Sequence, residues 1–306
     1  MRNGRVLLLV SAGLLSFSLS PILVRLASDA PAVTIAVWRT LFAVVFLTPF
    51  AAGKAASEVR RLTGREWALI TLAGILLGMH FIAWIDSIYH TTVASASVLF
   101  ATNPIFIAIL GFWILRERLH RRIVIAIVIA VIGAVLIALG DASDAARPNA
   151  EFGNVLALSS AFLFACYLLI GRVVRRKSSW LAYVYPLYVV VAVTVGAYAL
   201  VSGTALLGFD MRIYALCALM ALGPQLLGHG SFNYAVKYVP AAILGAAGLV
   251  EPVLAGIWAW LLFEEVPAAP AVVGALVVLA ALGMIYYYRL SLGSDPVVSE
   301  AESTSG

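Results

Sequence analysis

Eight polar or ionisable residues lie deep within long apolar stretches of this sequence, where a polar group is costly. Groups of this kind normally face the interior of a helix bundle and mark the path of a polar molecule or an ion. They therefore predict ligand binding and proton exchange in an apolar setting. The eight are Arg39, His80, Asp86, Asn103, Gln225, His229, Asn233 and Glu251.

Two of these residues are each followed by a proline, which lacks an N–H and frees a carbonyl one turn back in a helix. Glu251-Pro252 lies near the centre of its apolar run. Its carboxylate could bind a substrate ammonium or carry a proton, or it could be a structural partner for Arg39. Asn103-Pro104 offers an amide and a freed carbonyl, either to a ligand or to a neighbouring helix.

Arg39 suits a substrate carboxylate or phosphate, because a guanidinium can bind either group with paired hydrogen bonds. It could equally compensate the charge of Glu251 or Asp86 and lock two helices together. His80 and Trp84 are spaced i, i+4 and share one helix face, which suits stacking with an amphipathic molecule. His80 could carry a proton, or it could be a hydrogen-bonded core histidine.

A further polar and aromatic helix face contains Gln225, His229 and either Phe232 or Asn233. Phe232 could also be a packing residue without a role in binding. The expected substrate site, with Glu251 and His80 as the candidates for proton coupling, consists of Arg39, His80, Trp84, Asn103, Phe232, Asn233 and Glu251.

The composition requires a membrane setting for these residues. The chain has 306 residues, of which 63% are hydrophobic and 11% charged, against about half and a quarter in soluble domains. Its mean hydropathy is +1.03. The 20 Lys and Arg occur in short clusters between apolar runs, which argues against a nucleic-acid partner. We therefore expect an all-α integral membrane protein.

A bilayer requires about 20 apolar residues per spanning helix, and ten such runs are present. Sixteen of the 20 basic residues fall on one side if the N-terminus is inside, which predicts cytoplasmic termini and a cytoplasmic (inner) membrane location. The predicted spans are 5–26, 32–53, 67–89, 92–115, 121–140, 152–172, 181–203, 211–236, 240–263 and 269–290.

An offset of 148 residues superimposes the first five runs on the last five. Asn103-Pro104 aligns with Glu251-Pro252, and Glu117 aligns with Glu265. Because five spans is an odd number, the second copy enters the membrane from the opposite side. The sequence thus predicts two inverted repeats, 1–145 and 146–290, with a disordered cytoplasmic tail at 291–306. A substrate site is expected where such repeats meet.

These features resemble the EamA-type branch of the drug/metabolite transporter superfamily. The resemblance covers residues 5–290 and includes the Asn/Glu-Pro pairs, tryptophans after them (Trp113, Trp258 and Trp260), and Trp38-Arg39 in the second run. The second half departs from the first, because Leu187 stands where Arg39 would recur. The resemblance implies secondary transport, often export, of amino acids or other small metabolites.

Sequences typical of zinc proteases, serine hydrolases, P-loops and Cys/His metal sites are absent from the chain, so we expect no enzyme, cofactor, metal or ATP motor. The expected partners are a small-molecule substrate, membrane lipids and protons, in a monomer or homodimer. Nucleosides, sugar phosphates and drugs are further candidate substrates. Two different functions also fit the sequence: an intramembrane enzyme that uses Glu251 and His80 on a lipid-linked substrate, and a passive subunit in which Arg39 and Glu251 are paired and sealed.

Overall fold

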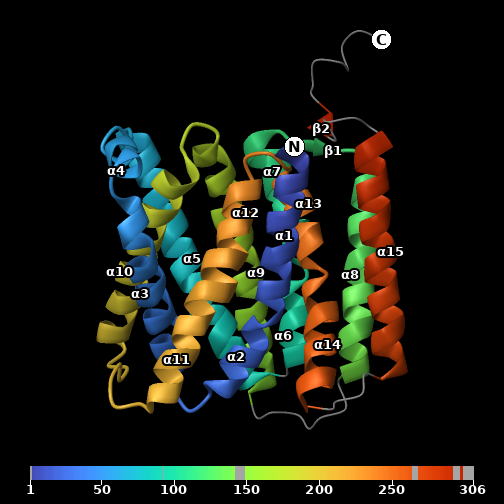
Figure 1. Cartoon of the computed structure of the whole chain (residues 1–306). Coiled ribbons are helices and arrows are strands. Elements are labelled where there is room, and N and C mark those ends of the chain that lie inside the picture. The colour runs from blue at the N-terminus through green and yellow to red at the C-terminus, as the bar shows by residue number, and fades with distance from the viewer. Residues whose placement is uncertain (1, 92, 142–148, 264–267, 292–296, 299–306) are drawn as a thin grey trace.

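The computed structural model describes residues 2–91, 93–141, 149–263, 268–291 and 297–298. The helices stand side by side in one bundle, and α1 begins at the same end of the bundle at which α15 finishes (Figure 1). The elements are α1 Arg2–Ser18, α2 Ser20–Leu26, α3 Ala32–Ala51, α4 Lys54–Val59, α5 Gly64–His90, α6 Val93–Phe100, α7 Asn103–Leu115, β1 Arg118–Leu119, α8 Arg121–Asp141, α9 Ala150–Arg175, α10 Trp180–Val201, α11 Met211–Met220, η1 Ala221–His229, α12 Gly230–Ala235, α13 Ala241–Gly248, α14 Glu251–Phe263, α15 Ala269–Ser291 and β2 Val297–Val298.

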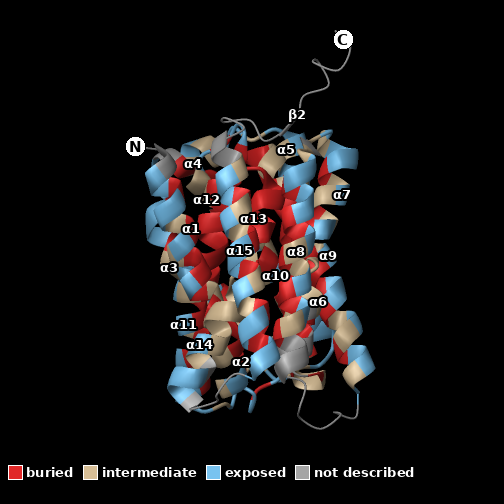
Figure 2. Cartoon of the chain, turned by 90° about the vertical axis from the view of Figure 1, so that its right-hand side faces the viewer, coloured by how far each residue is buried: buried red, intermediate tan, exposed pale blue. Residues whose placement is uncertain are grey.

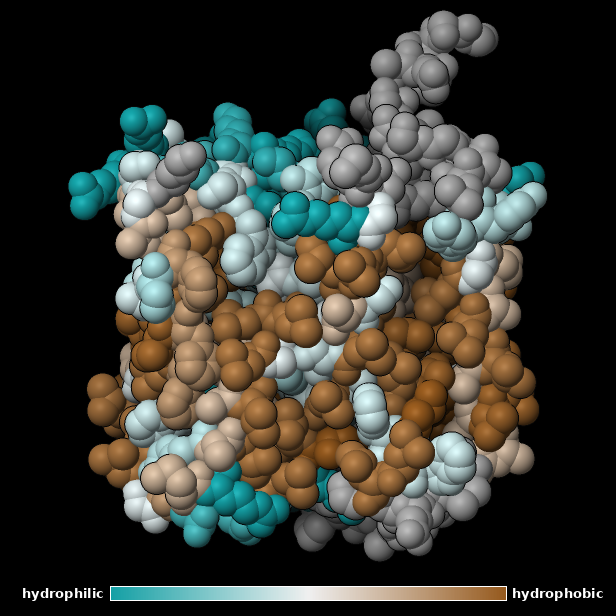
Figure 3. Space-filling model, viewed as in Figure 1, coloured by the Kyte–Doolittle hydropathy of each residue, from teal (hydrophilic) through white to brown (hydrophobic). Residues whose placement is uncertain are grey.

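Within the described ranges, eight helical stretches are long and apolar enough to cross a membrane. The surface agrees with this: on the face shown in Figure 3, apolar residues cover a broad middle band, and hydrophilic residues gather at its two ends. The chain is therefore a helical, multi-pass membrane protein, as its composition predicts, with one pair of two-residue strands, β1 and β2. The stretches are Gly4–Leu26, Ala32–Ala51, Gly64–His90, Ala150–Arg175, Trp180–Val201, Met211–Ala235, Ala241–Leu262 and Ala269–Tyr288.

Several apolar runs that read as continuous in the sequence are interrupted in the structure. Run 5–26 is divided between α1 and α2, run 92–115 between α6 and α7, and run 240–263 between α13 and α14. In each case the second helix has a proline in its first turn: Pro21, Pro104 or Pro252. Proline is tolerated there because the first N–H groups of a helix have no partner within it.

Run 211–236 is also interrupted, by the nine-residue π-helix η1 between α11 and α12. Pro224 lies inside η1 and cannot donate a backbone hydrogen bond. Each turn of a π-helix is wider and contains more residues than a turn of an α-helix, and π-helical turns are frequent at functional sites.

Helix α5 begins three residues before the predicted span because its start is capped by polar groups. The Thr63 hydroxyl accepts a hydrogen bond from the Glu66 N–H at 3.3 Å, and the Glu66 carboxylate accepts one from the Thr63 N–H at 2.8 Å. This reciprocal capping box satisfies two backbone donors. Hydropathy alone places the start at residue 67, because the first turn is polar.

The buried residues line the inside of the bundle, and the exposed faces of the helices point outward (Figure 2). Helices α8 and α15 lie together along one side. They approach so closely that a Cβ atom on Gly274 would lie 2.5 Å from the carbonyl oxygen of Gly133. Small residues permit this contact between membrane helices.

The predicted disordered tail, 291–306, lies almost entirely outside the described residues. Val297 and Val298 form β2, which pairs antiparallel with β1. The landmark Glu265 is also outside the described residues.

Candidate functional site

Two broken helices meet at the centre of the bundle. Asn103 is the first residue of α7 and Glu251 the first of α14. Both line the same central cavity, and both also line a smaller neighbouring cavity. Helix α13 packs onto α7 at this point, where a Cβ on Gly245 would lie 2.6 Å from Ile107. The two Pro-containing motifs of the sequence therefore come together in space.

The central cavity is lined by six large aromatic residues and six polar ones. Trp84 and Phe100 have ring centroids 5.0 Å apart, and Phe100 and Phe164 are 5.4 Å apart. The aromatic residues are Phe17, Phe81, Trp84, Phe100, Phe164 and Phe232, and the polar residues are Ser20, Arg39, His80, Asn103, His229 and Glu251.

Glu251 is partly exposed to this cavity. Its carboxylate makes neither a hydrogen bond nor an ion pair with any residue that the structure describes. It begins α14, where the unpaired N–H groups of the helix favour a negative charge. Glu251 is thus an acid available to a ligand or a proton.

Asn103 is 3% exposed, and its Nδ2 donates to the Phe100 carbonyl at 2.9 Å. Its Oδ1 has no hydrogen-bond partner among the described residues. A buried amide oxygen without a partner carries a desolvation cost that a ligand donor would relieve.

Arg39 lies on α3 and is buried at 1% exposure. Its Nε donates to Gln225 Oε1 at 3.1 Å, and its guanidinium lies 4.2 Å above the Phe81 ring. Within the described residues, no carboxylate lies within ion-pair distance of it. The pairings of Arg39 with Glu251 or Asp86 that the sequence left open are therefore absent from this conformation. Asp86 instead approaches His90, with Asp86 Oδ1 3.6 Å from His90 Nδ1.

Two histidines that line the cavity, His80 and His229, are neighbours, with ring centroids 5.8 Å apart in an edge-to-face arrangement. His80 Nδ1 lies 2.8 Å from Ser160 Oγ and 3.0 Å from the Ser160 carbonyl. His229 Nδ1 lies 3.0 Å from the Tyr167 hydroxyl. Both rings are oriented by partners on α9.

The structure separates two neighbouring residues that the sequence placed in the site. Phe232 lines the cavity, whereas Asn233 is not among the lining residues. Asn233 is fully buried near Gly171 and Tyr183, and its backbone carbonyl accepts a hydrogen bond from Arg175 Nε at 3.0 Å. Both side-chain polar atoms of Asn233 lack a partner among the described residues.

Sequence reasoning did not identify four of the aromatic lining residues, Phe17, Phe81, Phe100 and Phe164. A phenylalanine in an apolar helix has the same pattern whether it packs against lipid, protein or a ligand. Among the residues that the structure describes, no three or more metal-binding side chains cluster together.

Comparison with known proteins identifies the family. The sequence matches the EamA-like transporter family over residues 4–139 and again over residues 151–287. The chain belongs to the EamA-like transporter family. This confirms the resemblance seen in the sequence and makes the protein a multi-pass membrane transporter.

Relatives of this EamA-like protein are similar along most of its length. An uncharacterized transporter of Methanothermobacter thermautotrophicus is 24% identical over 281 residues, which are 86% of this chain and 80% of that relative. Pseudopaline exporter CntI of Pseudomonas aeruginosa is 25% identical over 285 residues, 92% of this chain and 95% of that protein. A crystal structure of another protein superposes with a TM-score of 0.79, at 12% identity, over 94% of this chain and 99% of that one, which shows the shared fold.

Proposed function

We propose that this EamA-like protein is a secondary active transporter that exports small metabolites, amino acids foremost, across the cytoplasmic membrane. The observation that carries the proposal is the central cavity, which aromatic side chains line. Among the described residues, Arg39 in this cavity has no acidic partner, and Glu251 has no hydrogen-bond or ion-pair partner. A molecule with an anionic group, a cationic group and an apolar body complements these features.

The proposed architecture is ten spanning helices in two inverted repeats, 1–145 and 146–290. The eight long stretches are completed by α6 with α7 and by α8, which is 21 residues long. The double family match supports two copies. The breaks before Asn103 and Glu251 also lie at the offset of 148 residues.

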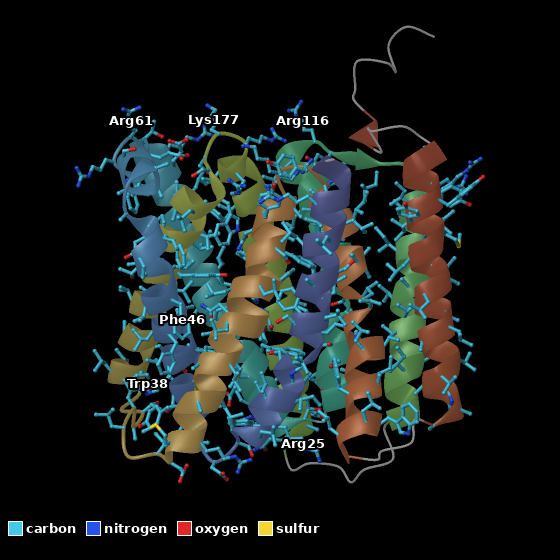
Figure 4. All side chains as sticks on the ribbon, in the orientation of Figure 1. Arg25, Trp38, Phe46, Arg61, Arg116 and Lys177 are labelled. Atoms are coloured by element: carbon cyan, nitrogen blue, oxygen red, sulfur yellow. The ribbon has the colours of Figure 1, made fainter. Side chains whose placement is uncertain are left out.

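The proposed orientation places both termini in the cytoplasm. Arg61, Arg116 and Lys177 lie at the end of the bundle where α1 begins, and Arg25 lies at the opposite end (Figure 4). An excess of basic residues on the cytoplasmic side favours this direction. Inverted repeats around a central cavity are suited to alternating access, in which the two halves rock around the site.

Glu251 is the better of the two proposed coupling residues. Its carboxylate has no protein partner within the described ranges, whereas His80 Nδ1 is held by Ser160. A group that must exchange a proton with a substrate or with water needs access to the cavity.

An intramembrane enzyme is the second candidate for one reason. Glu251 and His80 line the same cavity, as a base and an acid would have to do. Conversion of a lipid-linked compound would give a product of different mass, whereas transport leaves the compound unchanged.

The test is counterflow in proteoliposomes with labelled amino acids, nucleosides and sugar phosphates, with and without an imposed pH gradient. We expect amino acids to move without chemical change, and the Glu251→Gln protein to lose the response to the gradient. Mass analysis of the recovered compounds tests the enzyme in the same samples. Movement of nucleosides or sugar phosphates alone would contradict the amino-acid assignment.

A further inference from the structure

Arg39 is held in place by Gln225, a neutral residue from the other half of the chain. We propose that Gln225 positions Arg39 as the group that recognises an anionic substrate moiety, and that it thereby determines the charge specificity of the cavity. This inference rests on the proposed function and assigns the required substrate chemistry to an interaction between α3 and η1.

The geometry leaves part of the guanidinium available. Only Nε of Arg39 is engaged, by Gln225 Oε1, and the ring of Phe81 covers one face. The other two guanidinium nitrogens make no hydrogen bond to the described residues, and Arg39 lines the cavity. Two parallel N–H groups match the two oxygens of a carboxylate, or of a phosphate or phosphonate.

Gln225 is itself fixed from two directions. It belongs to the π-helix η1, and its backbone carbonyl accepts a hydrogen bond from the Tyr188 hydroxyl at 2.8 Å. Its side chain is fully buried, and Nε2 has no partner among the described residues. An amide that supplies only a carbonyl oxygen to Arg39 orients the cation without neutralising it, whereas a glutamate at this position would cancel the charge.

The second repeat offers an internal comparison for this interaction. At the offset of 148 residues, Arg39 corresponds to Leu187 and Gln225 to Leu77. Both leucines are fully buried, Leu187 on α10 and Leu77 on α5. These helices pack together, because a Cβ on Gly74 of α5 would lie 3.1 Å from the Leu187 carbonyl. The equivalent helix interface is thus apolar in the other half.

This difference favours a ligand-binding role over a structural one. A buried arginine without an acid destabilises a protein unless its charge is used, and apolar pairs commonly replace buried polar ones without loss of stability. The leucines show that this fold accommodates an apolar pair at equivalent positions. The polar pair in one half only therefore points to recognition of a charged molecule.

The test measures binding, so that it does not depend on transport. Purified protein in detergent is heated with phenylacetate, its neutral amide phenylacetamide, or phenylphosphonate, and the Tm is recorded against ligand concentration. Phenyl compounds are chosen because aromatic side chains line the cavity. We expect phenylacetate to bind at least about tenfold more tightly than the amide, as a hydrogen bond to a charged group implies. Phenylphosphonate shows whether the anion must be a carboxylate.

Gln225→Glu is expected to reduce this preference to within about threefold, because the new carboxylate pairs with Arg39. Gln225→Met, which keeps position 225 uncharged, is expected to weaken phenylacetate binding alone and serves if the glutamate variant does not fold. Leu77→Met, at the equivalent apolar position, is the matched control and should retain the wild-type preference.

Equal affinity of the wild-type protein for phenylacetate and phenylacetamide would overturn the anion site. Full preference for phenylacetate in both Gln225 variants would overturn the role of Gln225. A purely structural role predicts that the Gln225 variants lose affinity for the anion and the amide alike. If binding behaves as expected while no amino acid is transported, the proposed function fails and this inference stands.

Discussion

Arg172 on α9 and Glu117, two residues beyond the end of α7, form an ion pair, with Arg172 Nε 2.5 Å from Glu117 Oε1. Both side chains are largely buried, at 14% and 13% exposure. Arg172 Nη1 also donates to the carbonyls of Val236 and Val239, each at 2.9 Å. One arginine thus joins α7, α9 and the connection between α12 and α13. This is the end of the bundle at which α1 begins.

Loss of this ion pair is expected to open that end of the transporter. Glu117→Gln should destabilise the observed arrangement of this end by about 1–3 kcal/mol, because the largely buried Arg172 loses its charged partner. The probe is a cysteine in place of Gly248, which lines the cavity and has room for a side chain, since a Cβ atom there would meet no described heavy atom within 4 Å. The measurement uses the Gly248→Cys protein without Cys166 and Cys217. A membrane-impermeant maleimide applied from the Glu117 side should label it several-fold faster when it also carries Glu117→Gln than when it keeps Glu117.

Arg176→Ala provides the control for this measurement. Arg176 also approaches Glu117, but at 3.5 Å and with 58% of its side chain exposed. Exposed ion pairs contribute roughly 0–1 kcal/mol, so labelling should change little. Equal labelling rates in the wild-type and Glu117→Gln proteins would show that the ion pair does not control access.

The contact between α13 and α7 should be intolerant of even one methyl group. Gly245→Ala places a Cβ 2.6 Å from Ile107 Cδ1 and 3.0 Å from Asn103 Oδ1. Overpacking of this kind costs roughly 1–3 kcal/mol, which should appear as a lower Tm. Because the nearest atom is the end of a flexible side chain, Ile107→Val should recover part of the loss in the double variant. No recovery would mean that the backbone, not Ile107, limits the contact.

The spanning segments were predictable because a bilayer demands long apolar helices with internally satisfied backbones. Pro104 and Pro252 marked two polar sites within these runs, but both runs were predicted as continuous spans, and the structure divides each into two helices. What the sequence could not supply were the partners of the polar groups. Ser160 and Tyr167 lie about 80 and 60 residues from the histidines they contact, and nothing distinguishes them locally from other hydroxyl residues.

The position of Asn233 could not be predicted for a different reason. A periodicity of 3.6 residues relates Gln225 and His229 to the residues that follow. Gln225 and His229, however, both lie inside the π-helix η1, which contains more residues per turn than an α-helix and ends at His229. The face that α12 presents is rotated accordingly, so Phe232 lines the cavity and Asn233 lies elsewhere.

Phe232 and Asn233 should therefore respond differently to substitution. Phe232→Leu removes part of the aromatic lining and should raise the KM for substrates with large apolar groups. Asn233→Leu should leave the KM unchanged, because Asn233 does not line the cavity. Its effect on Tm should be small, since removing a buried polar group that has no partner among the described residues is close to neutral. A large change in KM for Asn233→Leu alone would contradict this arrangement.

Proton coupling and substrate binding should be separable in this transporter. Glu251 has no partner among the described residues, whereas His80 is anchored through Nδ1 to Ser160 on α9. If Glu251 carries the proton, Glu251→Gln should still exchange substrate in counterflow at equal pH but lose accumulation driven by a pH gradient. His80→Gln should instead slow both processes in proportion, because it removes an oriented ring from the cavity wall without removing the exchangeable acid. Retention of gradient-driven accumulation in Glu251→Gln together with its loss in His80→Gln would assign the proton to His80, and the two rates measured side by side in proteoliposomes decide between them.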